Sequence, residues 1–170
     1  MDWDLLASLA QVASAVVVVV GVWFAVAQIR EFRRQREDAA AVELVRSIQT
    51  PEFLDALMQI YSLPAGLDAD ALRRRGADVE QSAFLITFTL ENLGALVYQR
   101  AIALRSVDLL MGGVTRDAWR KLKEHALEQR RRLGTPNWGE WFQWLAERLE
   151  EHPVPGKSQG AYEAFRTWRP

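Results

Sequence analysis

Residues 5–29 read LLASLAQVASAVVVVVGVWFAVAQI, and no charged residue stands between Asp4 and Arg30. A helix over this stretch rises about 1.5 Å per residue and reaches about 37 Å, which is enough to cross a hydrocarbon core of about 30 Å with some tilt. The sequence therefore predicts one N-terminal transmembrane helix. Two alternatives stay open, namely a helix buried in a protein core and a signal peptide cleaved after Ala25-Val26-Ala27. The acidic start and the long apolar region disfavour the signal peptide.

Basic residues lie on only one side of this stretch. Four arginines follow it directly, and no Lys or Arg precedes it. Because cationic residues stay on the cytoplasmic side, we expect the N-terminus outside and the remaining chain in the cytoplasm, at the inner (plasma) membrane. The same arginines can contact anionic headgroups of the lipid bilayer, and we expect no nucleic-acid partner. The expected membrane-flanking residues are Trp3, Arg30, Arg33, Arg34 and Arg36.

One face of the predicted span carries mostly small or polar side chains at alternating spacings of four and three. This is a heptad-type stripe, in which Gly21 and Ala25 let two helix backbones approach closely. A glutamine in such an interface can hydrogen-bond across it, which contributes about 0.6–2 kcal/mol in lipid. We expect a homo-oligomer, or packing against another membrane protein, unless the stripe arises by chance. The expected interface residues are Ala7, Gln11, Ser14, Val18, Gly21, Ala25 and Gln28.

The rest of the chain has the size of one helical domain. The whole chain has a net charge of −1 and no cysteine, so nothing indicates a nucleic-acid partner, an anionic substrate, a disulfide or a thiolate metal site. We expect a transmembrane anchor with its basic flank at 1–36, a cytoplasmic helical bundle at 37–155 and a loosely packed tail at 156–170. The predicted fold class is all-α, with the first helix extending unbroken to Ser47 or Ile48.

Helical periodicity and capping residues predict the helices of this domain, and no period-two alternation predicts strands. Gly and Pro set most of the expected ends, and the central helix is expected to be apolar on most sides. The expected elements are a helix opened by Thr50-Pro51 and ended at Pro64, a short helix from Asp68 or Asp70 to Leu72, a central helix over Val79–Leu104, a short turn from Ser106 to Met111 stopped by Gly112-Gly113, a helix from Thr115 to Leu133 ended by Gly134, a helix opened by Thr135-Pro136 and ended by Pro153, and one loose turn near Tyr162.

Glu91 is the most suggestive polar residue, because it lies on the same face of the central helix as Phe84 and Phe88. A lone buried carboxylate is costly, so it must be paired or protonated. It either belongs to a ligand-binding or acid–base site, or it makes a structural ion pair or capping interaction with an Arg or Lys from a neighbouring helix, and we favour the structural role. No metal or cofactor is expected, since His125 and His152 are the only histidines and the chain has no Glu-x-x-His motif.

Four short motifs are spread over most of the chain. They are AQIR at 27–30, LENLGALV at 90–97, Trp119 with Lys121 and Leu122, and WFQWLAER at 141–148. Together they resemble a bacterial family catalogued only as a domain of unknown function, from which the chain departs at Asn92 and Trp144. The resemblance implies one N-terminal span followed by a cytoplasmic helical domain, and it implies no catalytic residues.

These observations predict a protein that acts through contacts rather than through chemistry. We expect a non-enzymatic, membrane-anchored helical scaffold or interaction protein that self-associates through its transmembrane helix. Two alternatives stay open. One is a membrane-tethered sensor or enzyme with a small-ligand pocket near Glu91, and the other is a subunit of a larger inner-membrane complex.

Overall fold

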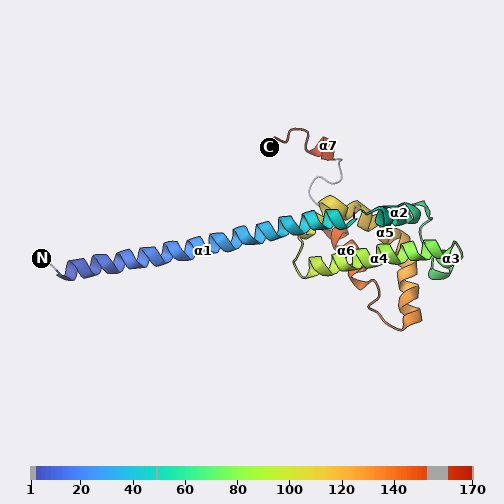
Figure 1. The fold of residues 1–170 in the computed structure, drawn as a ribbon, viewed down its shortest axis with the longest axis horizontal. Helices are drawn as coiled ribbons and strands as arrows, with labels where there is room; N and C mark the ends of the chain where they lie inside the picture. The colour runs from blue at the N-terminus through green and yellow to red at the C-terminus, as the bar shows by residue number, and fades with distance from the viewer. Residues whose placement is uncertain (1–2, 49, 153–160, 170) are drawn as a thin grey trace. The chain divides into compact units, whose positions relative to one another are not determined.

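The computed structural model describes residues 3–48, 50–152 and 161–169, and it shows an all-α protein with no strand in these ranges (Figure 1). The predicted fold class is confirmed in this respect. The chain divides into two compact units, 1–39 and 40–170. The helices are α1 (Trp3–Ile48), α2 (Pro51–Ser62), α3 (Ala69–Arg73), α4 (Ala77–Tyr98), α5 (Leu104–Leu133), α6 (Glu140–Glu151) and α7 (Ala161–Ala164).

The first helix is continuous and ends at Ile48, as predicted. Its large apolar side chains from Val16 to Phe32 are 42–71 % exposed. In the described parts of the chain, no helix combines the length and the mean hydropathy that a membrane span requires. The expected transmembrane span therefore stays a prediction.

Local capping chemistry starts α2 and α3 where the sequence predicts. The Thr50 hydroxyl accepts a hydrogen bond from the Phe53 N–H at 3.2 Å, and Pro51 takes the first helical position, where its missing N–H costs nothing. The Asp68 carboxylate accepts from the Ala71 N–H at 2.7 Å, which makes Asp68 and not Asp70 the N-cap of α3.

Two predicted helix boundaries in the middle of the domain are wrong. The central helix α4 ends at Tyr98 and not at Leu104, because Arg100 adopts a left-handed conformation with φ 58°. The N–H of Ala101 then donates back to the Leu96 carbonyl at 2.9 Å, which closes the helix end. The predicted stop at Gly112-Gly113 does not exist, since α5 runs through both glycines, and Thr115 lies buried in its interior instead of capping a new helix.

The end of α5 and the start of α6 are also set by glycines. Gly134 ends α5 with φ 63°, as predicted. The next helix begins at Glu140 and not at Thr135-Pro136, because Gly139, with φ 66°, is its N-cap. The Arg130 side chain holds the connection by donating to the carbonyls of Trp138 at 2.8 Å and Gly139 at 3.1 Å.

In the hydrophobic core of the second unit, α4 packs against α2, α3, α5 and α6, while Leu85, Phe88, Leu96 and Tyr98 of the same helix are exposed. The prediction of a central apolar helix is confirmed in this sense. Leu44, in the last turns of α1, is also part of this core. The fully buried apolar side chains include Ile60, Leu72, Ile86, Leu90, Val107, Phe142, Leu145 and Leu149.

Candidate functional site

Glu91 lies between α4 and α6, where its carboxylate caps the start of α6. The carboxylate accepts a hydrogen bond from the Phe142 N–H at 2.8 Å, and Phe142 is the third residue of that helix. The first N–H groups of a helix have no partner within the helix, and the N-terminal end carries a partial positive charge. A carboxylate supplied by a neighbouring helix satisfies both, so Glu91 acts here as a helix cap.

Three residues further along α4, Gly94 allows the backbone of α6 to approach. A Cβ atom at this position would lie 2.2 Å from the Trp141 carbonyl oxygen and 2.7 Å from its carbon, far inside van der Waals contact. The pair Glu91 and Gly94 therefore forms a docking position for α6, with a carboxylate to cap it and no side chain to hold it away. Glu91 therefore makes a structural contact at the position where the alternative prediction expects a ligand pocket.

The other motif residues also hold helices together. Trp119 packs edge-on against Phe142 with ring centroids 5.1 Å apart, and Leu122 is buried. The Lys121 ammonium donates to the carbonyl of Leu63, and it lies 3.4 Å from the carbonyl oxygen of Tyr61. These carbonyls lie at the C-terminal end of α2, where backbone oxygens lack helical partners and favour a cation.

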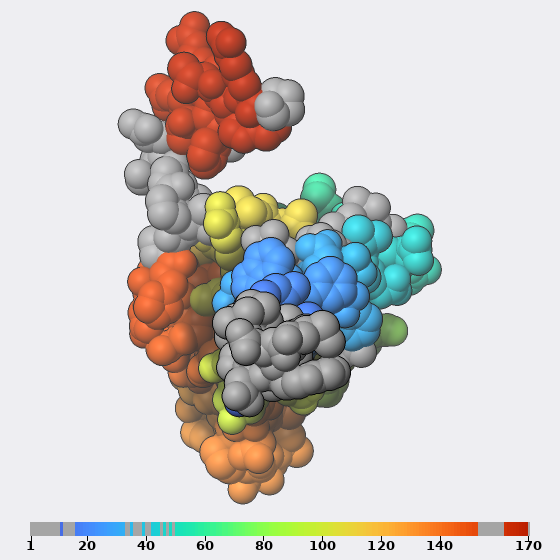
Figure 2. All heavy atoms as spheres, turned by 90° about the vertical axis from the view of Figure 1, so that its left-hand side faces the viewer, coloured from blue at the N-terminus to red at the C-terminus, as the bar shows by residue number. Residues whose placement is uncertain are grey.

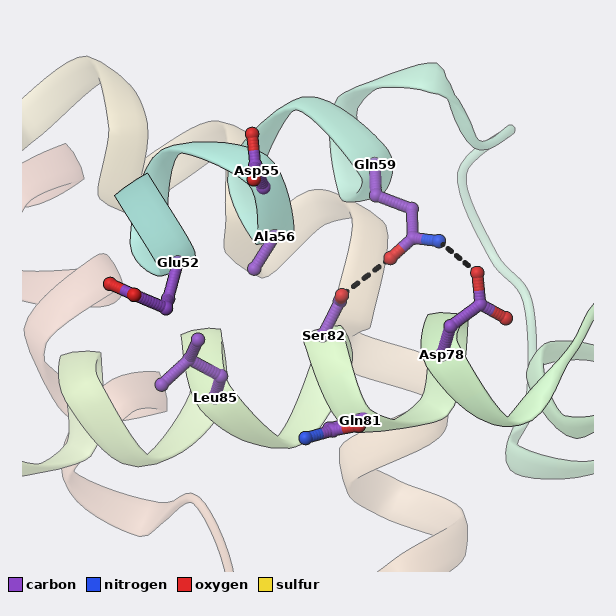
Figure 3. A pocket seen from close by; sticks show the side chains of 8 residues that line it. All are labelled: Glu52, Asp55, Ala56, Gln59, Asp78, Gln81, Ser82 and Leu85. Carbon is purple, nitrogen blue, oxygen red and sulfur yellow. Dashed lines mark hydrogen bonds between the residues drawn. The ribbon is translucent and has the colours of Figure 1, made fainter. Parts of the chain in front are cut away.

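An open groove of about 430 Å³ lies between α2 and α4 (Figure 3). The Gln59 amide bridges the two helices, since it donates to the Asp78 carboxylate at 2.8 Å and accepts from the Ser82 hydroxyl. Sequence reasoning missed this groove, although Glu52, Asp55 and Gln59 recur on one face of α2. The lining residues are Glu52, Asp55, Ala56, Gln59, Asp78, Gln81, Ser82 and Leu85.

Three carboxylates and no cation line this groove, so it attracts positive charge. The described residues hold no group of three His, Cys, Asp or Glu side chains placed to bind a metal ion. The groove contains neither a nucleophile–base pair nor a histidine. Its lining is that of a polar seam between two helices.

Sequence reasoning also missed an ion pair within α5, whose arginine connects α5 to α6 through a hydrogen bond to a backbone carbonyl. The Arg116 guanidinium lies 3.0 Å from the carboxylate of Asp108, which is 1 % exposed, and it donates to the Leu149 carbonyl at 3.1 Å. The two residues lie eight apart on α5, which places them on one helix face two turns apart. This spacing is the feature of the sequence from which the ion pair could have been predicted.

His125 is fully buried against aromatic rings. Its ring meets Phe84 and Trp138 edge-on, with centroids 5.7 and 5.3 Å away, and its Nε2 lies 3.3 Å from the Gln129 amide nitrogen. Burial lowers the pKa of His125 to about 4; Glu80 opposes this shift, whereas Arg132 and a second arginine add to it. The imidazole is thus neutral at pH 7 and belongs to the core.

The predicted interface stripe lies on α1. Its described side chains, Gln11, Val18, Gly21, Ala25 and Gln28, are exposed, and a Cβ added at Gly21 would meet nothing within 4 Å. Arg30 of the basic flank is exposed as well. The side chains of the other predicted residues, Trp3, Ala7, Ser14, Arg33, Arg34 and Arg36, lie outside the described part of the structure, as do residues 156–160 and 170 of the predicted tail.

Comparison with known proteins gives a family but no activity. No curated protein and no solved structure matches the chain. One family model, described as a domain of unknown function, matches residues 15–149 and so includes most of α1 and the helices through α6 up to Leu149. By this match the chain belongs to the DUF4760 family.

Proposed function

We propose that this protein is a non-enzymatic helical scaffold, anchored in a bilayer by α1 and self-associating through the stripe on that helix. The observation that carries the proposal is the exposed apolar surface of α1. Val17 is 70 % exposed and Trp23 is 71 % exposed, and the whole stretch 5–29 is uncharged in sequence. A helix that is apolar on all sides is stable only when buried in protein or in lipid.

The flanking charges give the proposed anchor a direction. Arg30, Arg33, Arg34 and Arg36 follow the apolar stretch, with Glu31 the only acidic residue from 30 to 36. Under the positive-inside rule, the domain that follows lies in the cytoplasm at the inner membrane, and the N-terminus lies outside. The arginines then lie at the level of anionic headgroups.

The stripe supports self-association. Gly21 and Ala25 are exposed, four residues apart, and Gly21 has open space around its Cα. Hydrocarbon offers no hydrophobic drive for helix pairing, so close backbone approach and side-chain hydrogen bonds must supply it. Small residues in this stripe and Gln11 at its outer end provide both.

A scaffold agrees better with the site geometry than a sensor or an enzyme near Glu91. The Glu91 carboxylate already accepts from Phe142, and Gly94 brings the α6 backbone against α4 at the same place. The groove that the structure forms lies between α2 and α4, and Glu91 does not line it.

Two measurements on the full chain test the proposal. Membranes carrying the protein are washed at alkaline pH, and an anchored chain stays in the pellet, whereas release into the wash contradicts the anchor. The mass of the protein is then measured in lipid nanodiscs.

We expect Gly21→Leu to reduce the oligomer toward monomer, because the added side chain holds the backbones apart. Val19→Leu is the matched control, because it also introduces a leucine but at a position outside the stripe. An unchanged oligomer size for Gly21→Leu, in lipid and in detergent, rules out this interface.

A further inference from the structure

The C-terminal segment, defined here as residues 161–169, carries three exposed aromatic side chains. Tyr162 is 85 % exposed, Phe165 is 51 % exposed and Trp168 is 70 % exposed. The space-filling view draws this segment in red (Figure 2). Large aromatic rings left in water are unfavourable, because each can bury about 150–250 Å² of surface. The segment therefore lacks a partner that covers it.

The three rings recur at intervals of three residues. The segment begins as the short helix α7, and the Trp168 N–H donates to the Phe165 carbonyl at 2.9 Å, which keeps the chain turning after that helix ends. The three rings therefore stand within seven residues of one short turning segment.

Cations accompany the rings. Arg166 and Arg169 are exposed, and in the described ranges neither guanidinium forms an ion pair with a carboxylate. Glu163 is the only acidic residue from 161 to 169, so the segment carries an excess of positive charge. Its partner must accept aromatic rings and offer negative charge in the same place.

A bilayer surface has both properties. Tyr and Trp rings favour the headgroup level of a membrane, and Arg side chains reach anionic headgroups beside them. We propose that the C-terminal segment docks on the anionic inner surface of the membrane, with Tyr162, Phe165 and Trp168 at headgroup depth. This proposal rests on the proposed function, because the anchor α1 keeps the domain close to that surface. It gives the domain a second attachment to lipid beyond α1.

The absence of native cysteine allows a test with a single label. A Thr167→Cys variant of the full chain carries an environment-sensitive fluorophore and is reconstituted into vesicles of phosphatidylcholine, with or without phosphatidylglycerol. A Lys123→Cys variant, labelled at an exposed position on α5, is the matched control. Iodide in the water and nitroxide-bearing lipids in the bilayer then compete to quench each fluorophore.

We expect lipid nitroxides to quench the Thr167 label in vesicles with phosphatidylglycerol and iodide to lose access to it, while the Lys123 label stays open to iodide. The double variant Arg166→Gln, Arg169→Gln should lower the docking equilibrium constant about 25-fold, since each cation near an anionic surface contributes about 5-fold. Equal iodide access at both positions overturns the proposal. Shielding of Thr167 that is independent of lipid composition overturns docking on anionic lipid too, and indicates uncharged lipid where the nitroxides quench the label and a protein partner where they do not.

An alkaline wash of the same vesicles separates this proposal from the anchor. Protein that resists the wash while its Thr167 label stays open to iodide refutes docking alone. Protein lost in the wash refutes the anchor alone. In that case, flotation of the unwashed chain with phosphatidylglycerol vesicles, and its loss in the double arginine variant, still measures docking.

Discussion

The effect of Gly94→Ala on the free energy of unfolding follows directly from the contacts of α4 with α6. The new Cβ would lie 2.2 Å from the Trp141 carbonyl oxygen, and the contacts are to the backbone of α6, which cannot rotate away. Ordinary contact would require α6 to move by more than about 1 Å, in an interior packed to crystal density. Such overpacking costs about 1–3 kcal/mol.

The same displacement weakens the Glu91 cap. Its 2.8 Å hydrogen bond to the Phe142 N–H lengthens as α6 moves away, and a lost N-terminal cap costs about 0.5–2 kcal/mol. Replacing a helical glycine by alanine returns about 0.5–1 kcal/mol of helix propensity. We therefore expect Gly94→Ala to lower the free energy of unfolding by about 2 kcal/mol.

Urea titration of the full chain in detergent micelles, followed by Trp fluorescence and far-UV circular dichroism, measures this change. Gly113→Ala is the matched control, because Gly113 is an exposed glycine inside α5 and a Cβ there meets nothing within 4 Å. The control should raise stability by up to about 1 kcal/mol. Opposite signs for the two variants are the expected result, whereas equal stabilisation would refute the close approach of α4 and α6.

Three further predictions follow from the core and the termini. Arg116→Met removes the guanidinium that pairs with buried Asp108 and should lower the free energy of unfolding by about 3 kcal/mol. Arg120→Met, at an exposed ion pair on the same helix, should lower it by less than about 1 kcal/mol. The midpoints of urea unfolding measure both changes. Burial lowers the pKa of His125 to about 4, so as the pH falls the unfolded chain protonates this histidine before the folded chain does. The stability that neutral His125 contributes is therefore complete above about pH 6.5, and about 3 kcal/mol of it is lost by pH 4. His125→Gln should remove that part of the slope between pH 7 and 4, and an unchanged slope assigns it to other groups. A reporter fused after the C-terminus should be active in the cytoplasm, and periplasmic activity would reverse the proposed topology.

Local chemistry explains which helix boundaries could be predicted. The helix ends at Thr50-Pro51 and at Gly134 depend on contacts with backbone groups a few residues away. They can therefore be predicted from the local sequence. Gly112-Gly113 reads as a break by the same local logic, but two helical glycines cost only about 1 kcal/mol each. Burial of Val107, Met111 and Ala118 on the same helix outweighs that cost, and the helices that α5 packs against are distant in sequence from the glycines.

The polar contacts were harder to predict for the same reason. The sequence predicts that Glu91 needs a partner, but the predicted partner, an Arg or Lys side chain of a neighbouring helix, is wrong. The partner, the Phe142 N–H, lies 51 residues away and is a backbone group, which carries no side-chain signal. The start of α6 was misplaced because Thr135-Pro136 resembles a local cap, while the actual N-cap is Gly139 and the carboxylate that completes it comes from α4.

The Lys121 contact also bears on how the chain is completed during synthesis. The carbonyl of Leu63 that it caps lies 58 residues earlier in the chain. At about 5–20 residues per second, a ribosome needs roughly 3–12 s to make the intervening chain. For that interval the carbonyls of Tyr61 and Leu63 have water in place of the Lys121 ammonium, so the cation that caps this end of α2 is added only after α5 has been synthesised.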